Sequence, residues 1–299
     1  MAYDAARNVV LLFGGGGLND TWIWDGTLWT QLNPPQIPPP RTSACMTYDS
    51  LHHTVLLFGG VSVGGLPLAD TWQWNGTTWT QLLPPQSPPA RLGAVMAYAE
   101  AQQVVVLFSG ESFGKRVGFL LNDTWIWNGT QWNHQSLPAS PSSRVGATMI
   151  YDPANQQLVL FGGTSGSSVY SDTWIWDGHQ WQQHLPTVSP PARAWATMVY
   201  ATSLQQAILV GGSSVSTNPS ISGLNDTWQW DGATWSPLIS ASAPTGGYNS
   251  AAYDATQQAL IMYASTNSKS YPSNKQGSSQ TNPNASSLMR GETWIWHAG

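Results

Sequence analysis

The strongest constraint on the fold is a motif, Asp-Thr-Trp-x-Trp, that returns along the whole 299-residue chain. Five copies begin with aspartate and a sixth with glutamate, at Asp20, Asp70, Asp123, Asp172, Asp226 and Glu292. A tyrosine and, 11 residues later, a doublet of small residues precede each copy, and the tyrosines recur at periods of 45, 50, 53, 49 and 53 residues. Self-similarity with a period near 50 predicts an array of packed structural units.

The second unit shows the expected secondary structure most clearly. Four strands, here named A to D, are predicted at residues 41–48 (RTSACMTY), 54–60 (TVLLFGG), 70–76 (DTWQWNG) and 78–82 (TWTQL). Strand B is apolar throughout, as expected for a strand covered on both faces, and the Asp-Gly or Asn-Gly between C and D indicates a hairpin. Such a unit buries both faces only when about six of them pack around an axis, with tryptophans filling the gaps.

The glycine doublet after an apolar strand, the later tryptophan pair and the period near 50 resemble the kelch repeat. The resemblance covers essentially the whole chain and implies an all-β, six-bladed β-propeller of four-stranded antiparallel blades, as one domain over residues 1–299. The units are expected at about 1–40, 41–90, 91–143, 144–192, 193–245 and 246–299. The first strand A is partial and the last strand D is expected to be missing, so we expect an excerpt of a longer protein or a truncated gene product.

Composition narrows the possible partners. Charged residues make up 8% of the chain and the formal net charge is −5, which leaves no basic surface for nucleic acid. No stretch approaches the ~18 apolar residues of a membrane-spanning helix, so no membrane insertion is expected. Low charge and a single cysteine favour a bacterial extracellular or cell-surface protein, although the first residues, MAYDAARN, show no secretion signal. We expect a monomer.

Neither a metal site nor another cofactor is expected. The histidines fall in turns, on outer strands or at the end of the chain. The kelch family includes a copper enzyme, galactose oxidase, in which a strand-A cysteine is cross-linked to a tyrosine that follows a neighbouring arginine. Cys45 lies in a strand A, but the matching position after Arg91 is Leu92-Gly93, and the copper histidines have no counterpart. Cys45 is therefore expected to be a small packed thiol.

Ligand-binding residues are expected on the face formed by the B–C and D–A connections, because the B–C connections vary most in length. The aromatic residues outside the repeat positions all map to this face: Phe113, Phe119, Tyr170, Trp195, Tyr248 and Tyr271. Trp195 and Tyr248 hold equivalent places, two residues past the start of strand A in neighbouring units. Exposed rings at a concave mouth suit a sugar or an anchored peptide. The alternative is that long loops bury their own rings.

Basic residues at the same face have two interpretations. Arginine begins strand A in four units, at Arg41, Arg91, Arg144 and Arg193. The resemblance to kelch adaptors that grip acidic peptides implies that these side chains contact carboxylates of a ligand. The alternative is an ion pair with the aspartate that begins strand C at the same end. The adjacent pair Lys115-Arg116, between Phe113 and Phe119, is expected to reach toward an anionic partner.

These observations favour a non-catalytic recognition scaffold that binds a glycan or a peptide or protein ligand on the B–C/D–A face. One alternative is an enzyme resembling kelch-type sugar epimerases or hydrolases, with Glu111 and an arginine of the mouth in its site. Glycosidase chemistry needs two carboxylates about 5–10 Å apart, and the sequence indicates no partner for Glu111. A second alternative is a purely structural module of a larger surface protein.

Overall fold

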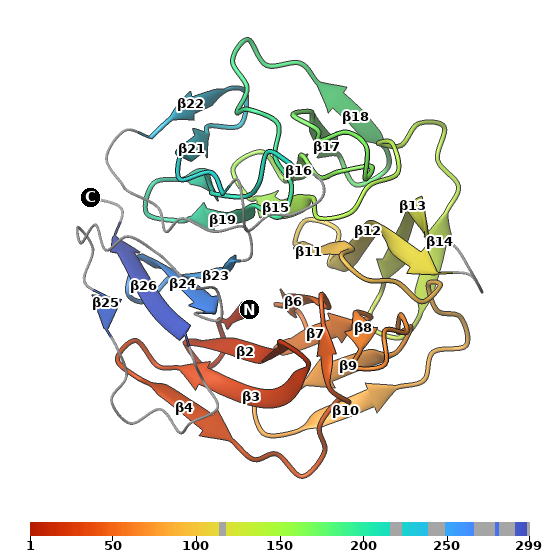
Figure 1. The fold of residues 1–299 in the computed structure, drawn as a ribbon, viewed down its shortest axis with the longest axis vertical. Helices are drawn as coiled ribbons and strands as arrows, with labels where there is room; N and C mark the ends of the chain where they lie inside the picture. The colour runs from red at the N-terminus through yellow and green to blue at the C-terminus, as the bar shows by residue number, and fades with distance from the viewer. Residues whose placement is uncertain (114–117, 216–222, 239–248, 266–278, 281–290, 298–299) are drawn as a thin grey trace.

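The computed structural model describes residues 1–113, 118–215, 223–238, 249–265, 279–280 and 291–297. All regular elements among them are β-strands. They form six four-stranded antiparallel sheets arranged as blades around an axis (Figure 1), together with one short two-stranded ladder. The six-bladed propeller predicted from the repeat is confirmed.

The first three blades run from an inner strand A to an outer strand D. Blade one contains β1 (Ala2–Asp4), β2 (Val9–Gly15), β3 (Leu18–Trp24) and β4 (Trp29–Leu32). Blade two contains β6 (Cys45–Asp49), β7 (Thr54–Phe58), β9 (Thr71–Trp74) and β10 (Trp79–Leu82), while β5 (Arg41–Thr42) pairs with β8 (Val61–Ser62). Blade three contains β11 (Val95–Ala99), β12 (Val104–Phe113), β13 (Gly118–Trp127) and β14 (Trp132–Gln135).

The remaining blades repeat this order with one exception. Blade four contains β15 (Thr148–Asp152), β16 (Gln157–Phe161), β17 (Thr173–Trp176) and β18 (Trp181–His184). Blade five contains β19 (Thr197–Ala201), β20 (Gln206–Val210), β21 (Thr227–Trp230) and β22 (Trp235–Pro237). Blade six contains β23 (Asn249–Asp254), β24 (Ala259–Ser265), β26 (Gly291–His297) and, at its outer edge, β25 (Ser279–Gln280).

The core lies between neighbouring blades, as the tryptophan repeat predicts. All five residues of β7 are buried. Trp74 and Trp79 face each other across the β9–β10 hairpin with ring centroids 5.4 Å apart, and both are fully buried. The ring of Trp79 also meets Phe13 of blade one edge-on at 5.1 Å. Each wide indole therefore contributes apolar area to its own sheet and to the adjacent one.

A hydrogen bond between blades explains the threonine of the motif. Trp79 Nε1 of blade two donates to Thr21 Oγ1 of blade one over 3.0 Å, and both side chains are buried. The same bond recurs as Trp132–Thr71 (2.9 Å), Trp181–Thr124 (3.0 Å), Trp235–Thr173 (3.0 Å) and Trp29–Thr293 (2.8 Å). Thr227 of blade five has no such indole donor in the described part of the chain.

Blades one and six close the ring without exchanging strands. Trp29 of blade one reaches Thr293 of blade six, and its ring lies 6.2 Å from that of Tyr263. The expected strand D after β26 is not the outer strand of blade six: its place is taken by β25, which comes from the connection that precedes β26 and pairs antiparallel with β26. A bare strand edge presents unpaired backbone N–H and C=O groups, which an extended segment can satisfy.

On the face opposite the predicted binding face, repeat tyrosines form hydrogen bonds between neighbouring blades. Tyr48 Oη accepts a hydrogen bond from the backbone N–H of Ala6 in blade one at 3.1 Å, and Tyr151 accepts the equivalent bond from Ala101 at 3.2 Å. The A–B turns of one blade are thereby bonded to the next blade. The repeat residues on this face serve the scaffold.

Candidate ligand-binding face

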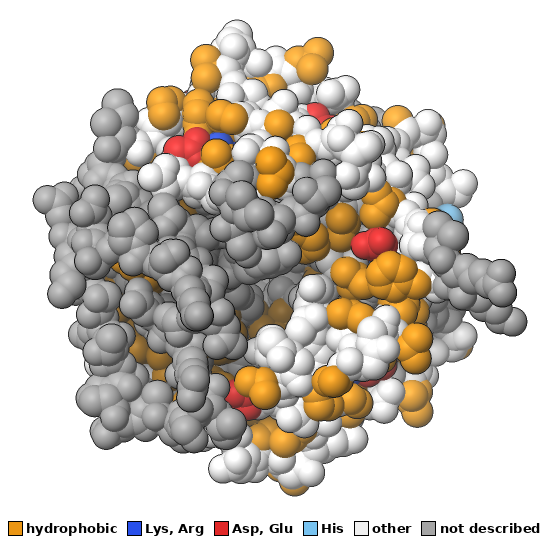
Figure 2. Space-filling view, in the orientation of Figure 1, with side chains coloured by type: hydrophobic (Ala, Val, Ile, Leu, Met, Phe, Trp, Pro, Cys, Tyr) orange, Lys and Arg blue, Asp and Glu red, His pale blue; other side chains and the backbone are white. Residues whose placement is uncertain are grey.

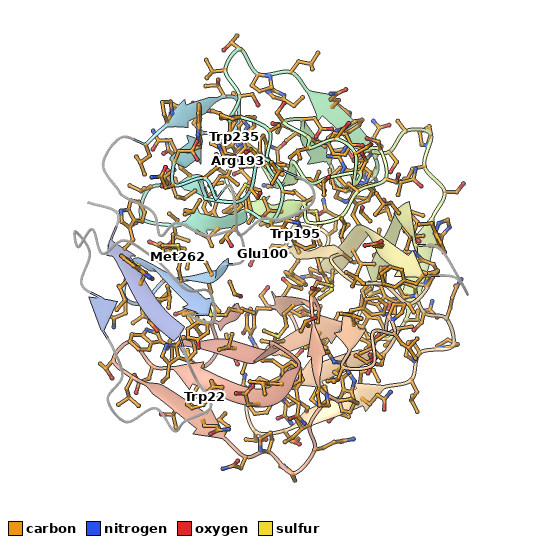
Figure 3. The ribbon with its side chains drawn as sticks, in the orientation of Figure 1. Trp22, Glu100, Arg193, Trp195, Trp235 and Met262 are labelled. Carbon is orange, nitrogen blue, oxygen red and sulfur yellow. The ribbon has the colours of Figure 1, made fainter. Side chains whose placement is uncertain are left out.

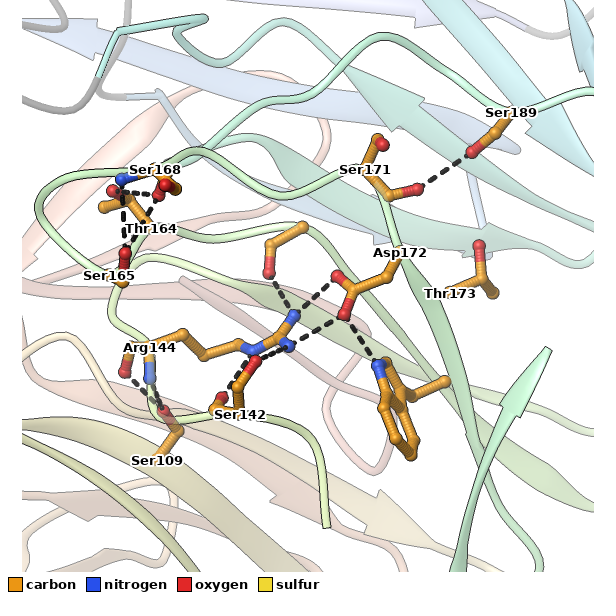
Figure 4. A network of polar contacts seen from close by, with 12 residues as sticks. Ser109, Ser142, Arg144, Thr164, Ser165, Ser168, Ser171, Asp172, Thr173 and Ser189 are labelled. Carbon is orange, nitrogen blue, oxygen red and sulfur yellow. Dashed lines mark hydrogen bonds and ion pairs between the residues drawn. The ribbon is translucent and has the colours of Figure 1, made fainter. Parts of the chain in front are cut away.

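The arginines that begin strand A are buried inside their blades. Arg144 shows the arrangement (Figure 4): Nη1 and Nη2 donate to the two carboxylate oxygens of Asp172 at 2.7 and 2.8 Å, and Nη1 and Nε donate to the carbonyls of Gly162 and Ser142. Equivalent bonds join Arg41 to Asp70, Arg91 to Asp123 and Arg193 to Asp226. The four arginines are at most 1% exposed. The alternative of an ion pair is confirmed, and a direct role in ligand binding stays a prediction.

A tryptophan of the motif completes each of these ion pairs. Trp125 Nε1 donates to Asp123 Oδ2 over 2.7 Å. Burial by itself raises the pKa of the Asp123 carboxyl, but the hydrogen bonds from Arg91 and Trp125 and the Arg91 charge outweigh burial and leave this pKa below its ordinary value. The pKa values of Asp70 and Asp226 are lowered by the same balance. In blades two to four, the carboxylate, the threonine hydroxyl and the first indole N–H of the Asp-Thr-Trp sequence therefore each have a partner within the scaffold.

Just past the arginines, a belt of backbone hydrogen bonds links four blades at the mouth of the ring. We define the belt by the third residue of each strand-A segment, Ser43, Gly93, Gly146 and Trp195. All four residues have left-handed backbone angles, with φ between 54° and 66°. Three hydrogen bonds join the four residues, each from an N–H to the belt carbonyl of the preceding blade: Gly93 to Ser43 (2.9 Å), Gly146 to Gly93 (3.1 Å) and Trp195 to Gly146 (2.7 Å). The belt fixes where the side chains at this position stand relative to one another.

Trp195 is the large side chain of the belt, and its indole lies across the two glycines before it. A Cβ added to Gly146 would come within 2.6–3.0 Å of three indole atoms, and one added to Gly93 would meet the far end of the ring at 3.1 Å. Figure 3 places Trp195 near the centre of the propeller. A bulky residue held at φ 60° costs about 1–3 kcal/mol, and strain of this kind concentrates at functional sites. The ring is half-buried.

Phe113 and Phe119 lie on strands, whereas the sequence predicts a loop. The B–C hairpin of blade three extends beyond those of its neighbours, with Ser112 opposite Phe119 and Phe113 opposite Gly118. Phe113 is 42% exposed and Phe119 is 51% exposed. A hairpin places these rings on a paired backbone, which costs less ordering entropy on binding than a loop does. Lys115 and Arg116 lie outside the described residues.

Exposed aliphatic side chains on the same face were missed by the sequence analysis. Leu18, the first residue of β3, is 41% exposed, and Val63 and Leu66, from the B–C connection of blade two, are 74% and 70% exposed. Figure 2 shows hydrophobic side chains gathered over the lower right of the ring, where blades two and three lie. A search restricted to aromatic residues could not find these side chains. The sequence does indicate exposure at such positions, because a leucine or valine in a glycine-rich connection is not part of a sheet that packs against a neighbouring blade.

Tyr170 has a structural contact that favours the loop-packing alternative for this ring. The guanidinium carbon of Arg144 lies 4.4 Å from the centroid of the Tyr170 ring, a cation–π geometry. The backbone of Tyr170 also accepts a hydrogen bond from Arg193 N at 3.0 Å. Tyr248 and Tyr271 lie outside the described residues, so their predicted binding role stays a prediction.

The groups that would support chemistry are isolated in the described part of the chain. Burial raises the pKa of Glu111, whose carboxylate lies where a Cβ on Gly118 would touch it, alongside Phe113. Burial also raises the pKa of the Cys45 thiol, to about 12, and its Sγ donates to the Phe58 carbonyl. Among the described residues no three His, Cys, Asp or Glu side chains gather in a way that could hold a metal ion.

Fold and face together define the class of protein as a six-bladed β-propeller whose architecture is compatible with a binding scaffold. No protein-family model and no curated protein matches the sequence. The described residues contain no helix of the length and hydropathy needed to cross a membrane.

Proposed function

We propose that the chain is a kelch-type propeller that acts as a non-catalytic recognition scaffold, with its ligand bound on the B–C/D–A face. The observation that carries this proposal is Trp195. It is a half-buried indole that occupies a strained belt position, at which blades two to four have serine or glycine. The scaffold does not need an indole there, because the belt bonds are made by the backbone.

The surrounding surface favours a polypeptide ligand over a glycan. Phe113 and Phe119 are exposed on a paired hairpin, and aliphatic Val63 and Leu66 are exposed in the adjacent blade. Sugars stack on flat rings, whereas branched aliphatic side chains bury well only against apolar groups of comparable shape. This surface, which is apolar and carries little charge, therefore suits a protein segment anchored by hydrophobic side chains.

Retention on immobilised ligands tests this proposal. Wild-type protein is passed over cell-extract proteins and over a panel of polysaccharides, beside Trp195→Ala and a Phe113→Ser/Phe119→Ser double variant. The matched control is Leu51→Ser, which removes an exposed apolar side chain from an A–B turn on the opposite face. We expect a polypeptide ligand that holds the wild type and the control but releases both face variants.

Two results would overturn the proposal in different ways. Retention on polysaccharide alone, lost in Trp195→Ala, would replace the polypeptide ligand by a glycan. Equal behaviour of all four proteins would make the rings packing residues and favour the structural-module alternative. Circular dichroism and thermal unfolding of each variant establish that a lost interaction does not reflect a lost fold.

The enzyme alternative is favoured by one observation, the raised pKa of Glu111. A carboxyl desolvated beside an aromatic ring is the arrangement of a general acid. Sugar epimerase and hydrolase assays on sialic acids and common polysaccharides, with Glu111→Gln as the control, decide between the two functions. Turnover by the wild type that disappears in Glu111→Gln would establish the enzyme.

A further inference from the structure

Glu111 is a carboxylate set in the apolar surface of blade three. It lies on β12 two residues before Phe113, so both side chains project from the same face of the hairpin. A Cβ added to Gly118, the residue opposite Phe113, would come within 2.6 Å of Glu111 Oε1 and 2.9 Å of Phe113 Cε1. The carboxylate and one edge of the ring therefore lie side by side against Gly118, where the absence of a side chain leaves room for both.

The backbone holds Glu111 from both sides. Its N–H donates to the carbonyl of Leu92 and its carbonyl accepts from the N–H of Leu92, each over 2.9 Å, while Leu120 of β13 stands opposite it on the other side. Leu92 directly precedes Gly93, so this pairing joins the hairpin of blade three to the belt. A ligand that binds the carboxylate therefore meets a backbone that is already ordered, which lowers the entropic cost of binding.

The charge of Glu111 has no counter-ion in the described part of the chain. None of the ion pairs found there includes this residue. Burial raises the pKa of the Glu111 carboxyl, whereas hydrogen bonds from Arg91 and Trp125 outweigh burial and lower the pKa of Asp123. Glu111 is therefore a partly desolvated carboxylate, and a cation supplied by a ligand would stabilise its charged form.

We propose that Glu111 and Phe113 form a subsite for an arginine side chain of the polypeptide ligand. The guanidinium donates hydrogen bonds to the Glu111 carboxylate while its plane rests on the ring of Phe113, which is 42% exposed. Guanidinium is favoured over ammonium because it is more weakly hydrated and stacks on aromatic rings, so it loses less on entering a half-buried apolar site. The inference rests on the proposed function for the polypeptide ligand, and it makes Glu111 a specificity-determining residue of that function.

The exposed neighbours of the subsite indicate what surrounds such an arginine in the ligand. Phe119, next to Gly118 on β13, is 51% exposed, and Val63 and Leu66 of the adjacent blade are 74% and 70% exposed. A carboxylate among apolar side chains disfavours an acidic ligand segment, because a second negative charge would be desolvated there without a partner. The segment that fits this surface is therefore an arginine flanked by hydrophobic residues.

The test measures the binding of N-acetyl-arginine amide to the whole protein through the backbone N–H resonance of Gly118 in ¹H–¹⁵N spectra. N-acetyl-lysine amide carries the same charge, and N-acetyl-citrulline amide has the shape of the arginine probe without its charge. All three probes are compared at matched ionic strength. We expect a saturable shift with a Kd of about 1–10 mM for the arginine probe. Binding of the other two should be about tenfold weaker.

Three variants assign the response to the two residues. Glu111→Gln should weaken the arginine probe about tenfold, because it removes the charge that accepts the hydrogen bonds. Phe113→Leu keeps an apolar side chain but removes the ring, and should weaken the probe about two- to fivefold. Glu100→Gln is the matched control, since it removes the same charge from an exposed glutamate in an A–B turn on the opposite face; it should leave the titration unchanged.

Any of three results would overturn the subsite. They are the absence of a saturable Gly118 shift with the arginine probe, equal binding of the arginine and lysine probes, and unchanged binding of the arginine probe in Glu111→Gln. The first two use only the wild type, so they hold whether or not a variant folds. Retention of Trp195→Ala on a polypeptide ligand tests the proposed function without these probes, so failure of the subsite and failure of the proposed function are distinguishable.

Discussion

Trp79 Nε1 lies 3.0 Å from Thr21 Oγ1, and this bond joins an outer strand of blade two to strand C of blade one. An indole N–H from one copy of the repeat and a hydroxyl from another therefore form a hydrogen bond in a buried interface. Blades two to four show in full why the motif recurs: the aspartate accepts hydrogen bonds from an arginine and an indole, the threonine accepts one from the next blade, and the second tryptophan packs between neighbouring sheets.

Removing the threonine hydroxyl should loosen one blade interface. Thr71→Val leaves Trp132 Nε1 buried without an acceptor, which costs about 1–3 kcal/mol of unfolding free energy. We expect Tm to fall by about 2–5 °C in a thermal scan followed by circular dichroism. Thr227→Val is the matched control, since Thr227 has no indole donor among the described residues. Equal losses in the two variants would contradict the role assigned to the inter-blade bond.

The buried ion pairs should make the free energy of unfolding depend on pH in the acidic range. Asp123 has a pKa below its ordinary value, so its contribution to the unfolding free energy is complete above the unfolded pKa of about 3.9 and is lost as pH falls through the folded pKa. Asp123→Asn leaves Arg91 buried and unpaired, which costs about 3–5 kcal/mol at neutral pH. We expect the difference in unfolding free energy between wild type and variant, measured by urea denaturation, to become smaller below about pH 4.

Asp20→Asn is the informative comparison for that experiment, because Asp20 has the indole partner but pairs with no arginine among the described residues. Its cost should be about 0.5–1.5 kcal/mol, the value of a single hydrogen bond. A loss as large as that of Asp123→Asn would mean that the arginine contributes little to stability in blades two to five.

The belt makes a prediction about coupled residues. Gly146→Ala adds a Cβ that meets the Trp195 ring at 2.6 Å, at a φ of 66° that already costs an alanine about 1–2 kcal/mol. We expect a larger loss than this in the wild-type background and only the backbone cost in a Trp195→Ala background. A double-mutant cycle from chemical denaturation measures the difference. Additive losses would show that the indole does not rest on Gly146 in solution.

Cys45 should be inert until the protein unfolds. Burial raises the pKa of its thiol to about 12, so the reactive thiolate is scarce at pH 8. We expect labelling by a thiol reagent to follow the unfolding rate and to become fast in denaturant. The same shift favours the folded state below the ordinary thiol pKa, about 8.5, and this advantage is lost as pH rises toward 12. Rapid labelling of the native protein would contradict the burial of Cys45.

Much of the fold can be predicted from the sequence because six copies of the repeat indicate the same order of strands. The strand order, the C–D hairpins and the arginine–aspartate alternative are all readable from spacing. The extended hairpin of blade three is not, because the segment ESFGKRVGFL has glycines and adjacent charges typical of a loop. The outer position of blade six is filled by Ser279–Gln280, a pairing that the spacing of the repeat does not indicate.

The candidate face was only partly predictable for a related reason. Phe113, Phe119 and Trp195 stood out because they are aromatic residues at places where the repeat requires none. Val63 and Leu66 did not stand out, because they are aliphatic and only their place in a glycine-rich connection indicates exposure. The left-handed backbone of Ser43 and Trp195 was also hidden, because neither residue type indicates a positive φ.

The belt also limits how the mouth can vary. Since its hydrogen bonds involve only the backbone, the side chain at each belt position can change without breaking the hydrogen bonds between blades. A wide ring at one position, however, occupies the space of the two positions before it, where Gly93 and Gly146 leave room for Trp195. A new bulky residue at a belt position would therefore need small residues at the two belt positions before it, and loss of Trp195 would free the space above Gly93 and Gly146.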